Sequence, residues 1–210
     1  MRYKFLAVLF LCLPFIVNAQ IISNYGLKIG VVSSKASDLS SQSYYSNLYR
    51  DSRISGSFGI FAQFLSSDYL RFEMELSYKQ EGAEDKIPVT TSENPDGTGQ
   101  FIIVDHAYDF LSFNISLQPK YETKDICLFA IISPSLNYML KNRDQILLTE
   151  DINKLVFGYN IGFGFQPKSF LNGNLFLEVR YGGSFSKYLK NDYLEAKFNT
   201  LQFSIGSYIN

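Results

Sequence analysis

The segment that most constrains the fold is a run of ten residues, 70–79, which alternates without interruption between large apolar and charged or polar side chains. It reads Leu-Arg-Phe-Glu-Met-Glu-Leu-Ser-Tyr-Lys. Successive side chains of a β-strand point to opposite faces, so this segment predicts a strand with one apolar face and one ionic face. If the ionic face meets water, the strand belongs to a soluble sheet. If the apolar face meets lipid, the chain is a membrane barrel.

The same alternation recurs along the rest of the chain. We count eight such segments, near residues 24–33, 55–65, 70–80, 107–118, 126–138, 155–166, 175–186 and 197–209. Each has about the ten residues that a tilted transmembrane strand requires, and none shows a sustained helical period. The pattern predicts an all-β fold, an eight-stranded antiparallel up-and-down transmembrane β-barrel.

The connections between the segments alternate in length. The short ones cover residues 66–69, 119–125 and 167–174, and the long ones cover 34–54, 81–106, 139–154 and 187–196. Outer-membrane barrels have short periplasmic turns and long extracellular loops. An even strand number then places both ends of the barrel at the periplasmic rim.

The composition of the two faces indicates which one points outward. One face is large and apolar, whereas the other is dominated by Gly, Ser and Asn, as in the run Gly158, Gly162 and Gly164. A soluble lipocalin-like ligand-binding barrel is the alternative, with the apolar face inside. A solvated outer face is usually rich in Lys and Glu, and small residues suit the narrow lumen of an eight-stranded barrel, so the membrane barrel is favoured. Tyrosines near segment ends are candidates for interfacial girdles: Tyr25, Tyr69, Tyr78, Tyr138 and Tyr188.

The N-terminus predicts export. A short basic start precedes an apolar run over residues 5–17, too short for a membrane helix, and small residues precede Gln20. We expect a cleaved signal peptide at residues 1–19 and an outer-membrane barrel domain at residues 20–210.

The net charge of −1 gives no basic footprint for nucleic acid. Removal of Cys12 would leave Cys127 alone, so no internal disulfide is expected.

Seven charged side chains occur at lumen-facing positions of this barrel. They are Lys28, Arg71, Glu73, Glu75, Lys79, Glu178 and Arg180. Unpaired buried charges are costly, so the seven are expected to form a structural network of ion pairs and hydrogen bonds. Such a network would plug the lumen and exclude a general diffusion pore.

An enzymatic site was considered around His106, the only histidine. Asp105 or Asp109 could orient its ring, and Ser112 is a nearby hydroxyl. No nucleophile motif surrounds that serine, so we expect no catalytic residues and an ordinary rim histidine.

Metal and cofactor sites are not expected. Acidic residues occur in two loops, but without calcium-loop spacing; they are Glu93, Asp96, Asp144, Glu150 and Asp151. We interpret them as solvated loop acids.

Recognition is expected at the long loops, which a rigid barrel displays. The first loop has the composition of a contact surface, with Tyr44, Tyr45, Tyr49 and Arg50. We expect a monomer in contact with outer-membrane lipid, with a protein partner at the extracellular loops.

The chain resembles the small outer-membrane β-barrel (PorT-like) family of Bacteroidota. The matching stretches are residues 26–30, 59–64, 75–82, 157–164 and 177–181. The resemblance covers nearly the whole mature chain and implies an eight-stranded outer-membrane barrel. It also implies an alternative role as an accessory of a secretion or gliding machinery. The chain ends Tyr208-Ile209-Asn210, whereas such barrels often end on an aromatic residue.

Overall fold

The computed structural model describes residues 22–37, 51–91, 98–143, 153–169, 173–190 and 195–209. The expected signal peptide lies outside this part of the chain. So do the loop residues singled out above, namely Tyr44, Tyr45, Tyr49, Arg50, Glu93, Asp96, Asp144, Glu150 and Asp151. Among the described residues, no helix has the length and apolar character needed to cross a membrane.

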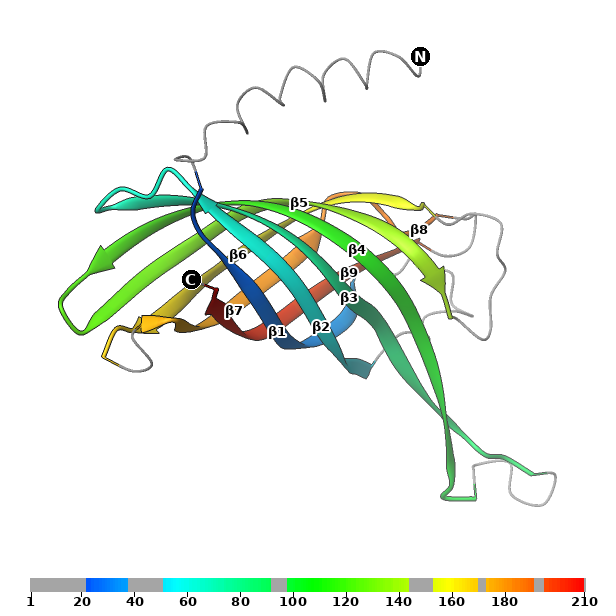
Figure 1. The fold of residues 1–210 in the computed structure, drawn as a ribbon. Coiled ribbons are helices and arrows are strands. Elements are labelled where there is room, and N and C mark those ends of the chain that lie inside the picture. Colours follow the sequence, from blue (N-terminus) through cyan, green and yellow to red (C-terminus); the bar gives the residue numbers. More distant parts are fainter. Residues whose placement is uncertain are drawn as a thin grey trace, which may run out of the picture.

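Within the described ranges, eight long strands form the fold, each antiparallel to its neighbours (Figure 1). They are β1 (Ile22–Ser37), β2 (Asp51–Phe64), β3 (Leu70–Pro88), β4 (Phe101–Glu122), β5 (Ile126–Asn142), β6 (Leu155–Pro167), β7 (Leu175–Ser184) and β9 (Glu195–Tyr208). A two-residue strand, β8 (Leu189–Lys190), pairs with β9.

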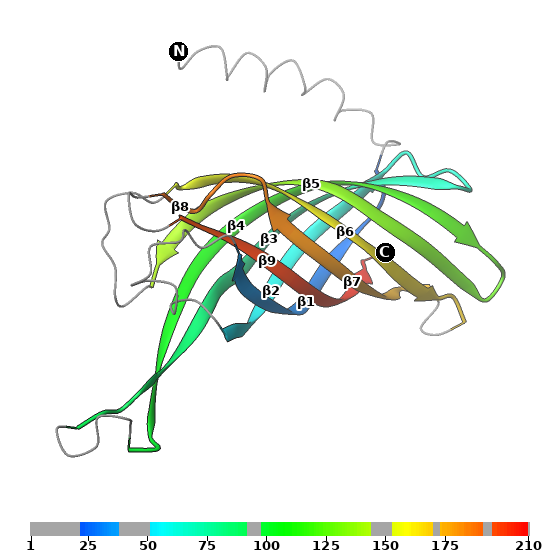
Figure 2. The ribbon, with the colours of Figure 1, turned by 180° about the vertical axis from the view of Figure 1, so that it is seen from behind.

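The sheet closes on itself because β1 pairs with both β2 and β9. Leu27 lies opposite Ile60 on one side and opposite Ser207 on the other. Figure 2 shows the same closed ring from behind. Closure removes the free sheet edges that would otherwise template aggregation. The predicted eight-stranded antiparallel barrel is confirmed.

The exterior of the barrel is apolar. On β4, Leu111, Phe113 and Ile115 are exposed, whereas the intervening Ser112 and Asn114 are buried. The other strands repeat this order, with exposed Ile, Leu and Phe side chains all around the ring. The lipocalin-like alternative, which required the apolar set inside, is therefore wrong.

The tyrosines expected in the girdles divide into two groups. Tyr25, Tyr69 and Tyr138 are exposed, and Tyr78 is partly exposed. Tyr188 is instead buried and bonded to Glu81, so its girdle assignment is wrong. It follows β7 in the chain and turns inward over the lumen.

The connection between β3 and β4 is a hairpin over most of its length. A loop was expected over residues 81–106, but β3 has 19 residues and β4 has 22, and the pairing extends to Pro88 opposite Phe101. A transmembrane strand needs only about 9–11 residues. Residues 82–88 and 101–107, here the projecting hairpin, therefore run on beyond the other strands (Figure 1).

The lumen contains aromatic rings as well as small residues. Gly164 stands against the ring of Phe129, and Gly206 against the ring of Phe176, so a Cβ at either glycine would collide with the ring. Glycine on one wall thus makes room for an aromatic from another. The buried apolar cluster consists of Phe61, Cys127, Phe129, Ile131, Phe176 and Tyr208.

Candidate functional site

Five of the predicted lumen charges meet in one buried group, here the central ion cluster: Lys28, Glu73, Glu75, Glu178 and Arg180. They come from β3 and β7, which lie opposite each other in the ring, and from β1, which lies midway between those two strands. Lys28 Nζ lies 2.9 Å from Glu178 Oε1 and 3.1 Å from Glu75 Oε2. Arg180 binds Glu75 at 2.9 Å and Glu178 at 2.6 Å. Glu73 contacts both cations, so every carboxylate has two positive partners.

The other two predicted members have different partners. Lys79 pairs with Glu81 at 2.6 Å, farther along β3. It lies four residues from Glu75, about 13 Å along a strand, so it is displaced from the cluster along the barrel. Arg71 has no carboxylate contact among the described residues and instead donates to Gln118 Oε1 and, at 2.9 Å, to Tyr208 Oη.

Glu81 is a lumen carboxylate that the sequence prediction missed, because residue 81 falls just beyond the expected third segment. It is buried, pairs with Lys79 and accepts a hydrogen bond from Tyr188 Oη at 2.8 Å. Glu81 brings the glutamates of this group to four, equal in number to its four buried cations. Two further buried carboxylates have other partners: Asp85 contacts His106, and Asp109 contacts Arg143.

Aromatic side chains fill the lumen on the long-loop side of the ion pairs. Ring centroids are 5.1 Å apart for Phe110 and Tyr188, 5.1 Å for Tyr188 and Phe198, and 5.6 Å for Tyr108 and Phe198. All four residues are buried. We call them the aromatic cap, since they pack across the end of the lumen next to the long loops.

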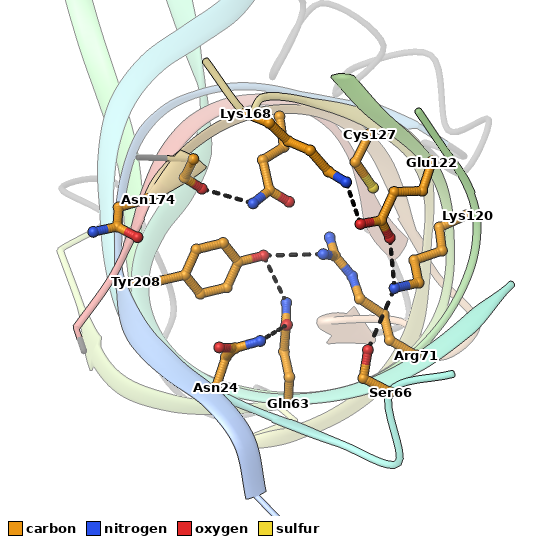
Figure 3. Close-up of a pocket in the computed structure, with 12 residues that line it drawn as sticks. Asn24, Gln63, Ser66, Arg71, Lys120, Glu122, Cys127, Lys168, Asn174 and Tyr208 are labelled. Carbon is orange, nitrogen blue, oxygen red and sulfur yellow. Dashed lines mark hydrogen bonds and ion pairs between the residues drawn. The ribbon is translucent and has the colours of Figure 1, made fainter. Parts of the chain in front are cut away.

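The opposite end of the lumen forms a polar pocket. It lies at the rim that carries the three short connections, here the short-turn rim, and has a volume of about 310 Å³. Figure 3 shows the side chains of Arg71, Tyr208 and Gln63 directed toward its centre, with Lys120, Glu122 and Lys168 along one side. The lining residues are Asn24, Gln63, Ser66, Arg71, Lys120, Glu122, Cys127, Gln166, Lys168, Gly173, Asn174 and Tyr208.

The wall of the pocket nearest the turns carries a small ion-pair group. Lys120 Nζ donates to Glu122 Oε2 at 2.9 Å, and Lys168 Nζ binds the other carboxylate oxygen. Hydrogen bonds from Lys168 and Lys120 lower the pKa of the Glu122 carboxyl below its usual value. These charges are partly exposed, so the pocket leads from the water-accessible rim down to the buried Arg71.

The residues considered for catalysis are not brought together. His106 and Ser112 are six residues apart on β4, about 20 Å along a strand. Ser112 donates to Asn137, whereas His106 is fully buried, rather than at a rim, with Nε2 3.1 Å from Asp85. Asp105 pairs with Arg53 and Asp109 with Arg143. Within the described ranges, no group of three or more metal-ligating side chains is present.

A closed antiparallel barrel with an apolar exterior and an ionic interior is the architecture of an integral outer-membrane β-barrel protein. A family model for the outer membrane protein beta-barrel domain matches residues 18–206. The chain belongs to this family and is an outer-membrane protein.

Solved structures show similar chains. Neisserial surface protein A is 17% identical, with 88% of this chain and 97% of that chain covered and a TM-score of 0.43. OprG from Pseudomonas aeruginosa is 9% identical, with 90% and 97% covered and a TM-score of 0.48. Ail, the attachment invasion locus protein of Yersinia pestis, is 12% identical, with 89% and 98% covered and a TM-score of 0.37. No curated protein matches the chain.

Proposed function

We propose that this protein is a non-enzymatic outer-membrane barrel that makes surface contacts through its long-loop rim. In this assignment a signal peptide at residues 1–19 directs export and is removed, and residues 20–210 form the barrel. The short-turn rim faces the periplasm, as in other outer-membrane barrels. The barrel is a monomer surrounded by lipid and has a protein partner outside the cell.

The projecting hairpin is the observation that carries this proposal. The large apolar side chains toward its tip are exposed, at 41% for Ile87, 62% for Phe101, 57% for Ile102 and 61% for Ile103. Phe101 and Ile103 lie on one face of the hairpin, and Ile87 and Ile102 pair on the other. Exposed contiguous apolar surface of this kind marks interaction sites.

Its position separates this surface from the lipid band. Phe101 precedes the lipid-facing Leu111 by ten residues, about 33 Å along the strand, far more than is needed to leave the bilayer. Contact with lipid therefore does not explain why apolar side chains are exposed at the hairpin tip. Contact with a partner protein would explain it.

The lumen supports an assignment without transport. The central ion cluster and the aromatic cap fill successive levels of an eight-stranded barrel, whose interior is only wide enough for side chains. A plugged lumen leaves the rims as the parts that meet other molecules.

Adhesion of cells that display the protein tests the proposal. The double variant Phe101→Ser with Ile103→Ser removes apolar surface from one face of the hairpin and touches no lumen contact. We expect adhesion to protein-coated surfaces to fall by about tenfold at equal surface display. That corresponds to roughly 1.4 kcal/mol, within the range for burying two large apolar side chains.

Leu65→Ser is the matched control, since Leu65 is 68% exposed at the short-turn rim. It should leave adhesion unchanged. Equal adhesion of the hairpin variant and the parent would overturn the surface-contact assignment. If that variant instead impaired protein secretion or gliding in the native host, the PorT-like accessory role would replace it.

A further inference from the structure

We propose that the short-turn-rim pocket binds a small phosphate-bearing molecule, with its phosphate group held by Arg71, Tyr208 and Lys168. This site is separate from the hairpin surface, because it opens at the opposite rim. Ligand binding at this pocket and adhesion through the hairpin can therefore be tested separately, and failure of one does not imply failure of the other.

Tyr208 presents a hydrogen-bond donor to the pocket. A tyrosine hydroxyl has one proton and two lone pairs. Tyr208 Oη accepts from Arg71 Nη1 at 2.9 Å and from Gln63 Nε2 at 3.0 Å, so both lone pairs are used. The proton must then point toward another acceptor. Figure 3 shows this hydroxyl near the centre of the pocket.

Arg71 supplies a second donor. It is only 3% exposed, and its Nε and Nη1 are bonded, but Nη2 has no hydrogen-bond partner among the described residues. A buried guanidinium is normally matched by a carboxylate or phosphate. Here its partners within the barrel are neutral, and its planar face lies 4.0 Å from the Phe129 ring centroid.

The charge of the pocket indicates the class of ligand. The lining contains Arg71, Lys120 and Lys168 against Glu122 alone, which is a net charge of +2. A phosphate monoester carries about −1.5 to −2 near neutral pH and offers three acceptor oxygens. The volume of about 310 Å³ leaves space for a small substituent besides the phosphate.

The pocket is open at the short-turn rim and closed at its inner end. The central ion cluster lies below Gln63, which donates to Glu73 at 3.2 Å, and the aromatic cap lies beyond the cluster. A molecule that enters from the turns is therefore retained at the mouth and does not pass through. The pocket therefore binds the phosphate-bearing molecule at this rim without transporting it.

Calorimetric titration of the folded full chain tests the inference. The protein is kept in a maltoside detergent, which has no phosphate, and titrated with inorganic phosphate and separately with glycerol 3-phosphate. We expect saturable binding that weakens as salt is raised. If both probes bind, the phosphate group is sufficient for recognition. If only glycerol 3-phosphate binds, the pocket also requires the organic substituent of the monoester.

Variants locate the site. Tyr208→Phe removes one hydroxyl and should weaken binding by about tenfold or more, since a hydrogen bond to a charged group contributes roughly 1.5–3 kcal/mol. Lys168→Gln, at the partly exposed rim, should weaken it at least about threefold and does not depend on the buried packing. Lys124→Gln, in the same group of turns but outside the lining, is the control and should bind as the parent does.

The outcomes are decisive in both directions. The inference is overturned if neither inorganic phosphate nor glycerol 3-phosphate binds saturably at millimolar concentration. Binding that Lys168→Gln and Lys124→Gln leave equally unchanged also overturns it, as does acetate binding as tight as phosphate binding.

Discussion

Shared contacts hold the central ion cluster together at the scale of single residues. Glu73, Glu75 and Glu178 each lie within ion-pair distance of both Lys28 and Arg180. Burial of charges is costly, and mutual attraction compensates only where the contacts are complete. Loss of one cation therefore exposes three carboxylates to each other.

Arg180→Met should destabilise the barrel strongly. Breaking a buried ion pair from one side costs about 3–5 kcal/mol, because the partner charge stays buried without compensation. Urea unfolding of the protein refolded in phospholipid vesicles measures the change. Lys124→Met, at an exposed lysine in the turn between β4 and β5, is the control and should leave the unfolding midpoint unchanged. A midpoint for Arg180→Met equal to that of the parent would contradict the structural role of the cluster.

The Glu122 carboxylate should resist protonation. Its pKa is lowered by hydrogen bonds from Lys168 and Lys120, so the contact is fully present above the pKa of an ordinary glutamate and is lost as pH falls through the lower folded pKa. A carboxyl carbon NMR titration should give a midpoint below that of an ordinary glutamate. Lys168→Gln should move that midpoint upward, and an unmoved midpoint would show that Lys168 does not cause the shift.

Sequence reasoning places a side chain inside or outside the barrel but not opposite a particular partner. The alternation on β3 correctly puts Arg71, Glu73 and Glu75 inside. It says nothing of Tyr208, which lies 137 residues from Arg71 in the chain and meets it only because the ring closes. Partner identity depends on strand tilt and register, and these belong to the whole sheet.

At the scale of elements, the projecting hairpin explains why the strand ends were missed. Residues 81–86 read Glu-Gly-Ala-Glu-Asp-Lys and have no apolar alternation, because beyond the bilayer neither face of a strand meets lipid. Main-chain pairing with β4 continues nonetheless, through Glu84 opposite Asp105 and Lys86 opposite Ile103. The short turns, by contrast, were foreseen close to their positions in the structure.

Shortening the hairpin should leave the barrel folded. Residues 86–103 are replaced by Asn-Gly, which joins the paired Asp85 and Val104 through a two-residue turn suited to a hairpin. Apart from an exposed ion pair between Lys86 and Asp51 of β2, at 3.7 Å, the removed residues pair with each other. An exposed pair of this kind contributes little to stability, so heat-modifiable gel migration and the urea midpoint should match those of the parent. Adhesion should be lost. Failure to fold would show that the hairpin tip is part of the barrel's stability.

At the scale of the whole molecule, the closed sheet surrounds a lumen that side chains occupy at several levels. The aromatic cap, the central ion cluster and the apolar cluster around Phe176 occupy successive levels between the rims. An eight-stranded barrel has no spare width beside such side chains.

Planar-bilayer recordings should therefore detect no stable conductance of porin size. Purified protein is compared with a sixteen-stranded porin at equal insertion. Long-lived, porin-sized steps from the purified chain would contradict a plugged lumen.

The seam between β1 and β9 has a consequence for biogenesis. The barrel closes only when Gly26 meets Tyr208, so its last contacts join the beginning of the chain to its end. Such a fold has high contact order and forms slowly. Until the final strand arrives, the nascent sheet exposes two unpaired edges and an apolar face in the periplasm. A chain cut short before β9 should consequently remain a client of chaperones and proteases rather than become a smaller barrel.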